Sequence, residues 1–209
     1  MELNSIGEGP AQWRSAFSTA AAWFAQVAPD VVGRLDDPGL GEWTVRDLLG
    51  HTTRSLITTE EYLTHDTTGI VDIPTAGAYL VAIRDVDHAA VAERGRAAGA
   101  ALGDDPLGFV RALVGRVPPL VEAAPGEARM RTPFGTMVLA EYVVSRTFEL
   151  VVHTGDLLRA IGRTDPPPDE AGRSALRLVS DVLAARGLAG DALSALTGRT
   201  ELAPGFTAL

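Results

Sequence analysis

Residues 137–161 read MVLAEYVVSRTFELVVHTGDLLRAI, and this stretch decides the fold class. Apolar residues recur in it every three or four positions, the spacing that places side chains along one face of an α-helix. The expected buried stripe consists of Leu139, Val143, Leu150, Leu157 and Ile161. A polar stripe made of Arg146, Glu149, His153 and Asp156 runs beside it. The stretch therefore predicts a long helix that carries chemically capable side chains next to a helical core.

Helical spacing recurs on both sides of this segment, and signals for strands are scarce. Thr44 is suited to cap a second helix, because Asp47 follows three positions later as in a variant of the capping box. We expect this helix to end near His65, with an apolar stripe of Val45, Leu48, Leu49, Leu56 and Leu63. Further helices are expected over residues 10–28, 76–102, 106–123, 169–186 and 190–197, with Pro10 in the first turn of the first one.

The connections between these helices are marked by proline and glycine. Pro29 and residues 33–41 predict a loop, and residues 124–136 predict a turn-rich connection with a short extended piece. Thr136 is suited to cap the helix over residues 137–161. The sequence thus predicts an all-α bundle over residues 1–162 and a short, mainly helical C-terminal extension over residues 163–209.

Composition excludes several classes of function. The 209 residues carry a formal net charge of −9, which argues against general binding of nucleic acid or of an anionic membrane. The chain has no cysteine, so it holds no disulfide, thiolate nucleophile or cysteine-ligated zinc. All of its basic residues are arginine, which excludes a lysine Schiff base. No apolar stretch is long enough to span a membrane, and we expect a cytoplasmic protein.

Three of the residues above form a candidate metal site. His153 follows Glu149 by four positions, so both side chains leave the same face of the predicted helix. An exposed Glu–His pair is the alternative interpretation of this spacing. His51 falls at the margin of the second helix's apolar face, where a half-buried packing residue is the alternative. Together the three side chains offer two nitrogens and one oxygen, which suits Zn²⁺ or another divalent ion. We expect the remaining histidines, His65 and His88, at the surface.

Two motifs resemble those of a known family. Residues 41–51, GEWTVRDLLGH, resemble the W-T/S-V-x-D-L-x-x-H opening of mycothiol-dependent maleylpyruvate isomerase-like proteins, which are DinB-like metal-binding four-helix bundles. Residues 146–157, RTFELVVHTGDL, are similar to the family's R-x-x-E-x-x-x-H-x-x-D-L helix. The turn over residues 132–135, TPFG, also resembles the one that introduces this helix. The resemblance covers roughly residues 10–162.

The resemblance implies a fold, a metal site and a chemistry. It implies that His51, Glu149 and His153 hold a divalent metal ion, usually zinc in the family. It also implies that mycothiol is the cosubstrate, activated by the metal for attack on an electrophilic substrate in an isomerisation or an S-transfer. Arg146 is the expected contact for a substrate carboxylate. The Arg- and Ala-rich composition is typical of a GC-rich genome, which agrees with an actinobacterial host.

The sequence also departs from the family. Maleylpyruvate isomerases of the family carry a larger C-terminal α/β domain that contributes to the active site, whereas only residues 169–209 follow the prolines here. The particular isomerisation therefore does not carry over. A non-catalytic protein that binds metal or a ligand is the alternative function, and a plain helical interaction domain is a third. Expected partners are a small-molecule thiol and an electrophile, with the chain as a monomer or homodimer.

Overall fold

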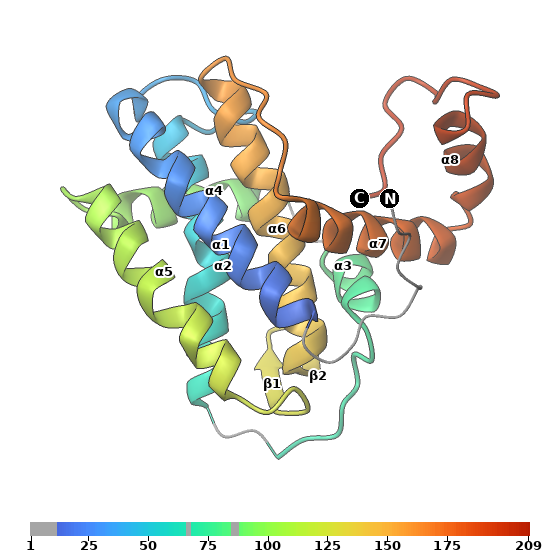
Figure 1. The fold of residues 1–209 in the computed structure, drawn as a ribbon, viewed down its shortest axis with the longest axis horizontal. Coiled ribbons are helices and arrows are strands. Elements are labelled where there is room, and N and C mark those ends of the chain that lie inside the picture. The colour runs from blue at the N-terminus through green and yellow to red at the C-terminus, as the bar shows by residue number, and fades with distance from the viewer. Residues whose placement is uncertain (1–11, 66–67, 85–87) are drawn as a thin grey trace.

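The computed structural model describes residues 12–65, 68–84 and 88–209 (Figure 1). Within these residues the prediction of an all-α fold is confirmed, with one small hairpin as the addition. The elements are α1 (Gln12–Val31), η1 (Val32–Arg34), α2 (Val45–Thr64), α3 (Ala76–Arg84), α4 (His88–Ala101), α5 (Pro106–Ala123), β1 (Arg129–Thr132), β2 (Gly135–Val138), α6 (Leu139–Ala160), α7 (Asp169–Ala185) and α8 (Ala189–Leu196).

Four long helices, α1, α2, α5 and α6, form the bundle. Helix α1 packs against α5 and α6, and α2 packs against the same two helices, so the four close into a ring around one core. Side chains of fully buried residues fill its centre, among them Phe17, Phe24, Leu48, Leu56, Leu113 and Leu150. Burial of these apolar side chains is the main term that stabilises the bundle.

Helix α2 begins where the sequence predicted, at a complete capping box. The Thr44 hydroxyl accepts from the backbone N–H of Asp47 at 3.2 Å, and the Asp47 carboxylate accepts from the backbone N–H of Thr44 at 3.0 Å. Two N–H groups that the helix cannot pair internally are thereby satisfied. This cap fixes the start of the helix, and with it the face on which His51 lies.

The single helix predicted over residues 76–102 is wrong, because α3 and α4 are separate helices. Helix α3 packs against α6 and α7, whereas α4 packs against α2. The two helices therefore bury their faces against different parts of the molecule, and one straight helix cannot reach both. Pro10 and residues 85–87 lie outside the described residues.

Two helix ends also differ from the prediction. Helix α1 continues through Pro29 to Val31, whose side chain is fully buried. A proline in the last turn removes one helical hydrogen bond, and the apolar contacts of Val31 offset that loss. Thr136 does not cap α6, because it lies in β2 and pairs with Arg131 of β1. The N-cap of α6 is Val138, which makes no side-chain capping bond.

The remaining helices pack on the outside of the bundle. Helix α4 crosses α2 at a contact between glycines, where a Cβ atom on Gly50 would lie less than 3.0 Å from the backbone of Ala98 and Gly99. Helix α7 packs against α1, α3 and α6, and α8 follows at its far end (Figure 1). The division of the chain between residues 162 and 163 stays a prediction.

Candidate metal centre

His51, Glu149 and His153 lie together where α2 and α6 pack side by side. One ligand atom from each residue can be chosen such that all three lie within 4.8 Å of one another. Nε2 of His153 is 3.2 Å from Oε2 of Glu149, and Nε2 of His51 is 4.0 Å from the same oxygen. The two imidazole rings meet edge to face, with 4.8 Å between their centroids. The three side chains are between 15% and 18% exposed, so the cluster is open to solvent on one side only.

Asp156 orients His153 from the side opposite to Glu149. Nδ1 of His153 lies 2.9 Å from Oδ2 of Asp156, and the other Asp156 oxygen accepts from Arg159. Burial lowers the pKa of His153, but hydrogen bonds to Asp156 and Glu149 outweigh this effect and raise the pKa to about 9. Nε2 of His153 and Oε2 of Glu149 face each other at 3.2 Å, so a cation bound to both would lie between these two atoms.

His51 is held differently, by ring contacts. The indole of Trp43 stacks on its imidazole with 4.6 Å between centroids and 37° between planes. Nδ1 of His51 is buried and has no hydrogen-bond partner among the described residues. Burial lowers the pKa of His51 to about 3, and the positive charge of His153 acts in the same direction. His51 is therefore a neutral imidazole, the form that ligates metal ions.

Glu149 supplies the negative charge of the cluster. Burial alone raises its pKa, yet the hydrogen bond from His153 and the positive charge of Arg146 lower it to about 2. A carboxylate with two imidazoles is a donor set that Zn²⁺ and similar ions accept. Donor atoms around tetrahedral zinc lie roughly 3.4 Å apart, as follows from bonds of about 2.1 Å. The distances of 3.2 and 4.0 Å from Glu149 to the two imidazoles bracket that value, and all three atoms lie within 4.8 Å of one another, so the donor set is suited to a divalent ion.

Arg146 lies one helical turn before Glu149 on α6, between two tyrosine rings. Its guanidinium carbon is 5.3 Å from the ring centroid of Tyr79 and 5.0 Å from that of Tyr142. Nε donates to Ser145, whereas Nη2 is buried without a hydrogen-bond partner in the described part of the chain. Burial raises the pKa of both tyrosines, so the rings stay neutral and only the charge of Arg146 is present there.

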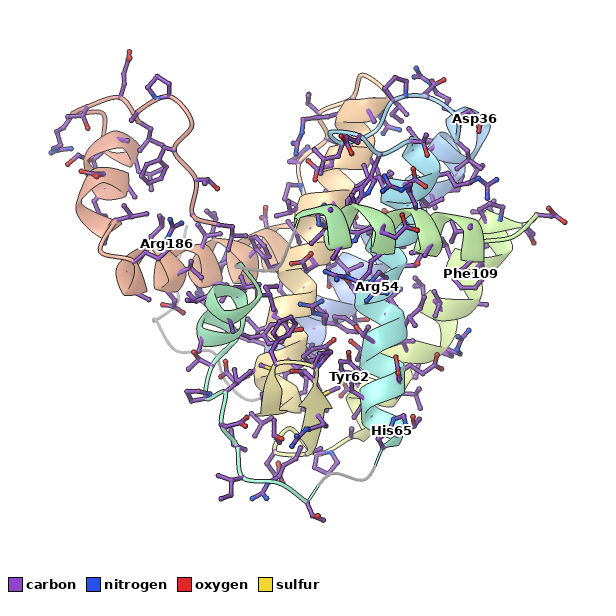
Figure 2. All side chains as sticks on the ribbon, turned by 180° about the vertical axis from the view of Figure 1, so that it is seen from behind. Asp36, Arg54, Tyr62, His65, Phe109 and Arg186 are labelled. Atoms are coloured by element: carbon purple, nitrogen blue, oxygen red, sulfur yellow. The ribbon has the colours of Figure 1, made fainter. Side chains whose placement is uncertain are left out.

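A second arginine, Arg54, lies on α2 one turn after His51. Helices α2 and α6 run antiparallel, and the Tyr142 hydroxyl donates to Thr58 at 2.7 Å, one turn further along. Since His51 is level with Glu149 and Thr58 is level with Tyr142, Arg54 lies at the level of Arg146. Figure 2 shows Arg54 and Tyr62 along α2, with α4 crossing above Arg54. Both arginines act to lower the pKa of His51, in agreement with their placement.

The sequence did not reveal several of these neighbours. Tyr142 precedes Arg146 by four positions on α6, a spacing that could have revealed this contact, whereas no short-range helical spacing links Trp43 to His51 or Tyr79 to Arg146. Asp156 was visible as part of the polar stripe, but its bond to His153 was not predicted. His65 is exposed at the end of α2, as expected, whereas the side chain of His88 lies outside the described residues.

Comparison with models of protein families identifies the family of the chain. The model described as the mycothiol maleylpyruvate isomerase N-terminal domain matches residues 13–158. The chain belongs to this family. Both motif segments of the chain lie inside the match, whereas α7 and α8 lie outside it. No curated protein and no solved structure gives a significant match. Among the described residues, no helix combines the length and hydropathy needed to cross a bilayer.

Proposed function

We propose that the protein is a metal-dependent enzyme that uses a small-molecule thiol, with His51, Glu149 and His153 as the metal ligands. The observation that carries this proposal is the convergence of the three ligand atoms within 4.8 Å. Three protein ligands leave coordination positions open, which is typical of catalytic rather than structural zinc sites. When bound, a divalent ion such as Zn²⁺ lowers the pKa of a coordinated thiol, so that the thiolate is available near neutral pH.

The chain's own residues prepare this site. Asp156 accepts the Nδ1 proton of His153, which leaves Nε2 as the ligating nitrogen. Among the described residues, Glu149 is the carboxylate of the ligand cluster, and its negative charge attracts a cation. The chain has no cysteine, so the reacting thiol comes from outside. Membership in the mycothiol family supports mycothiol as that thiol.

Arg146 and Arg54 are the proposed contacts for the second substrate. The buried Nη2 of Arg146 lacks a partner among the described residues, and such a donor is costly unless a ligand satisfies it. The side chain of Arg54 makes no hydrogen bond or ion pair within the described part of the chain. Both arginines lie one turn from the ligand cluster, so a carboxylate held there places the rest of the substrate beside the metal. We propose an electrophilic acid as substrate, for isomerisation or S-transfer.

Substitution of Glu149 by Gln tests the ligand assignment. The change preserves size and removes the anionic ligand, so we expect loss of metal content and of thiol-dependent turnover with the fold retained. Metal content, circular dichroism and conjugation of a generic electrophile by mycothiol or a surrogate thiol are measured on both proteins. Glu60→Gln is the matched control, because Glu60 forms a surface ion pair with Arg116. This pair contributes about 0–1 kcal/mol to the free energy of unfolding and nothing to metal binding.

The outcomes of this experiment distinguish the assignment of the metal ligands from the proposed thiol-dependent mechanism. Full metal occupancy in the Glu149→Gln protein contradicts the ligand assignment. Metal loss with unchanged thiol-dependent turnover supports the site and contradicts the mechanism. Tight thiol binding by the unmodified, metal-loaded chain, without turnover of any electrophile tried, favours a binding protein.

Substitution of Arg146 by Met tests the substrate contact. Met preserves most of the side-chain volume between the tyrosine rings but cannot pair with an anion. A hydrogen bond to a charged group contributes about 1.5–3 kcal/mol, so we expect the KM for a carboxylate-bearing electrophile to rise about 10-fold or more. Metal content and turnover of an uncharged electrophile are expected to stay unchanged, as in the control Arg111→Met on the exposed side of α5. Equal losses with both electrophiles contradict the assignment.

A further inference from the structure

Trp43 makes two contacts that link α4 to the candidate metal centre. Its indole packs against the imidazole of His51, with 4.6 Å between centroids and the two ring planes tilted by 37°. Its Nε1–H donates to the backbone carbonyl of Ala92 on α4 at 3.0 Å. The side chain is only 8% exposed, although it precedes the first turn of α2 and sits next to a loop. The indole is thus fixed by α4 and in turn limits where the His51 ring lies.

A glycine on α4 makes room for this indole. A Cβ atom on Gly95 would lie less than 3.0 Å from three indole atoms, Cε2, Cζ2 and Nε1. No side chain larger than hydrogen is therefore accommodated at this position while Trp43 stays in place. Four residues later, Gly99 also packs closely against Asp47 and Arg46, whose nearest atoms would lie 2.7–3.1 Å from an added Cβ. The two glycines on one face of α4 bring its backbone against the start of α2.

The two histidines differ in what orients them. The ring of His153 is fixed by a hydrogen bond to Asp156, as is usual for metal-ligating histidines. His51 has no such bond, since its Nδ1 is buried without a partner among the described residues. Its ring orientation therefore depends on packing, and among the described residues two aromatic rings contact it: the tilted indole of Trp43 and the edge-to-face imidazole of His153.

We propose that Trp43 is a positioning residue for His51, which uses its contact with α4 to hold the imidazole in the orientation that binds metal. This inference rests on the proposed metal site. A ligated imidazole is electron-poor, and the face of an indole is the best aromatic partner for positive charge. Trp43 therefore contributes to metal affinity through the ring of His51 without touching the ion.

Metal titrations of the full chain test this role. Trp43→Leu removes the indole, Trp43→Phe keeps an aromatic face but loses the bond to Ala92, and Gly95→Ala displaces the indole. Trp13→Leu is the matched control, because Trp13 is a similarly buried tryptophan, 7% exposed, in the core beside Gly126. Gly115→Ala is the control for Gly95→Ala, because no atom lies within 4 Å of its added methyl. The readouts are the dissociation constant for Zn²⁺, the absorption spectrum of bound Co²⁺ and the melting temperature.

We expect Trp43→Leu to raise the dissociation constant about 10-fold or more, the range found for residues that orient metal ligands. Gly95→Ala should change the Co²⁺ spectrum and weaken binding, and Trp43→Phe, which keeps a ring beside His51 but loses the bond to Ala92 on α4, should bind with an affinity between those of Trp43→Leu and the unmodified chain. Both controls should bind metal as the unmodified chain does, even where Trp13→Leu lowers the melting temperature. A Trp43→Leu protein that is folded at the assay temperature and keeps the unmodified affinity and spectrum overturns this inference alone. Absence of metal binding by the unmodified chain overturns it together with the proposed function.

Discussion

His153 is the residue on which most of the local electrostatics depends. It faces Glu149 through Nε2 and Asp156 through Nδ1, so one imidazole ring is held between two carboxylates. Glu149 belongs to the cluster that faces the ion, whereas Asp156 lies behind the ring. The same helix supplies all three residues within two turns, so their relative placement follows directly from helical spacing.

Substitution of Asp156 by Asn tests the orienting role of Asp156 separately from the proposed ligand role of Glu149. The amide has no charge and holds the Nδ1–H bond less strongly, so His153 becomes a poorer ligand. We expect metal affinity to fall about 10–100-fold, the usual effect of losing the acceptor behind a ligating histidine. Metal titration monitored by calorimetry measures this change.

Arg159→Gln is the control for that experiment. Arg159 is 63% exposed and binds the other oxygen of Asp156, so its loss leaves the bond to His153 intact. Similar metal affinities for Asp156→Asn and the unmodified chain would show that Asp156 has no role in orienting His153.

At the scale of elements, α2 and α6 were predictable because each carries its own signals. The capping residues Thr44 and Asp47 and the apolar stripe that follows them are local, and local patterns can be seen in sequence. The break between α3 and α4 was not predictable from such patterns. Residues 76–102 are rich in alanine, which favours helix, and the different packing partners of the two halves cannot be read from local spacing.

The contacts that complete the site also depend on packing between helices that are distant in the sequence. His51, Glu149 and His153 were chosen from spacing and family resemblance, and the structure brings their side chains together. Trp43 is held beside His51 by α4, which approaches the start of α2 at glycines, a contact between segments about fifty residues apart in the chain. No periodicity in either segment records which helix packs against it.

Substitution of Gly50 by Ala tests the close crossing of α2 and α4. The added methyl meets backbone atoms of Ala98 and Gly99, which cannot rotate away, so the helices must separate. We expect a loss of about 1–3 kcal/mol in the free energy of unfolding, as found when tightly packed sites are overfilled. Gly115→Ala on α5 is the matched control, and its open surroundings predict a gain of about 0.4–1 kcal/mol. Urea unfolding measures the change in the free energy of unfolding for both variants. Changes of the same sign would contradict a close contact between α2 and α4 at Gly50.

At the scale of the whole molecule, the candidate metal centre joins the two halves of the bundle. His51 comes from α2, and Glu149 and His153 come from α6. The unfolded chain does not hold these residues together, so metal binding adds its free energy to that of folding. The ion would therefore act as a cross-link between helices distant in sequence.

Thermal unfolding with and without metal tests this linkage. At a free Zn²⁺ concentration 100 times the dissociation constant, the folded state gains about 2.7 kcal/mol. For a chain of this size that corresponds to a rise of about 5–10 °C in the melting temperature. The Glu149→Gln protein should show no rise, and an equal rise in both proteins would place the stabilising ion elsewhere. Removal of metal with a chelator should reverse the effect in the unmodified chain.

The donor set of this centre has a consequence for chemical durability. Two imidazoles and a carboxylate contain no sulfur, and the chain has no cysteine anywhere. Metal sites built from cysteine lose their ion when peroxide oxidises the thiolates, because sulfenic and sulfinic acids are poor ligands. Two imidazoles and a carboxylate are not oxidised in this way. If the proposed function is correct, peroxide would oxidise the incoming thiol before it damaged the three protein ligands.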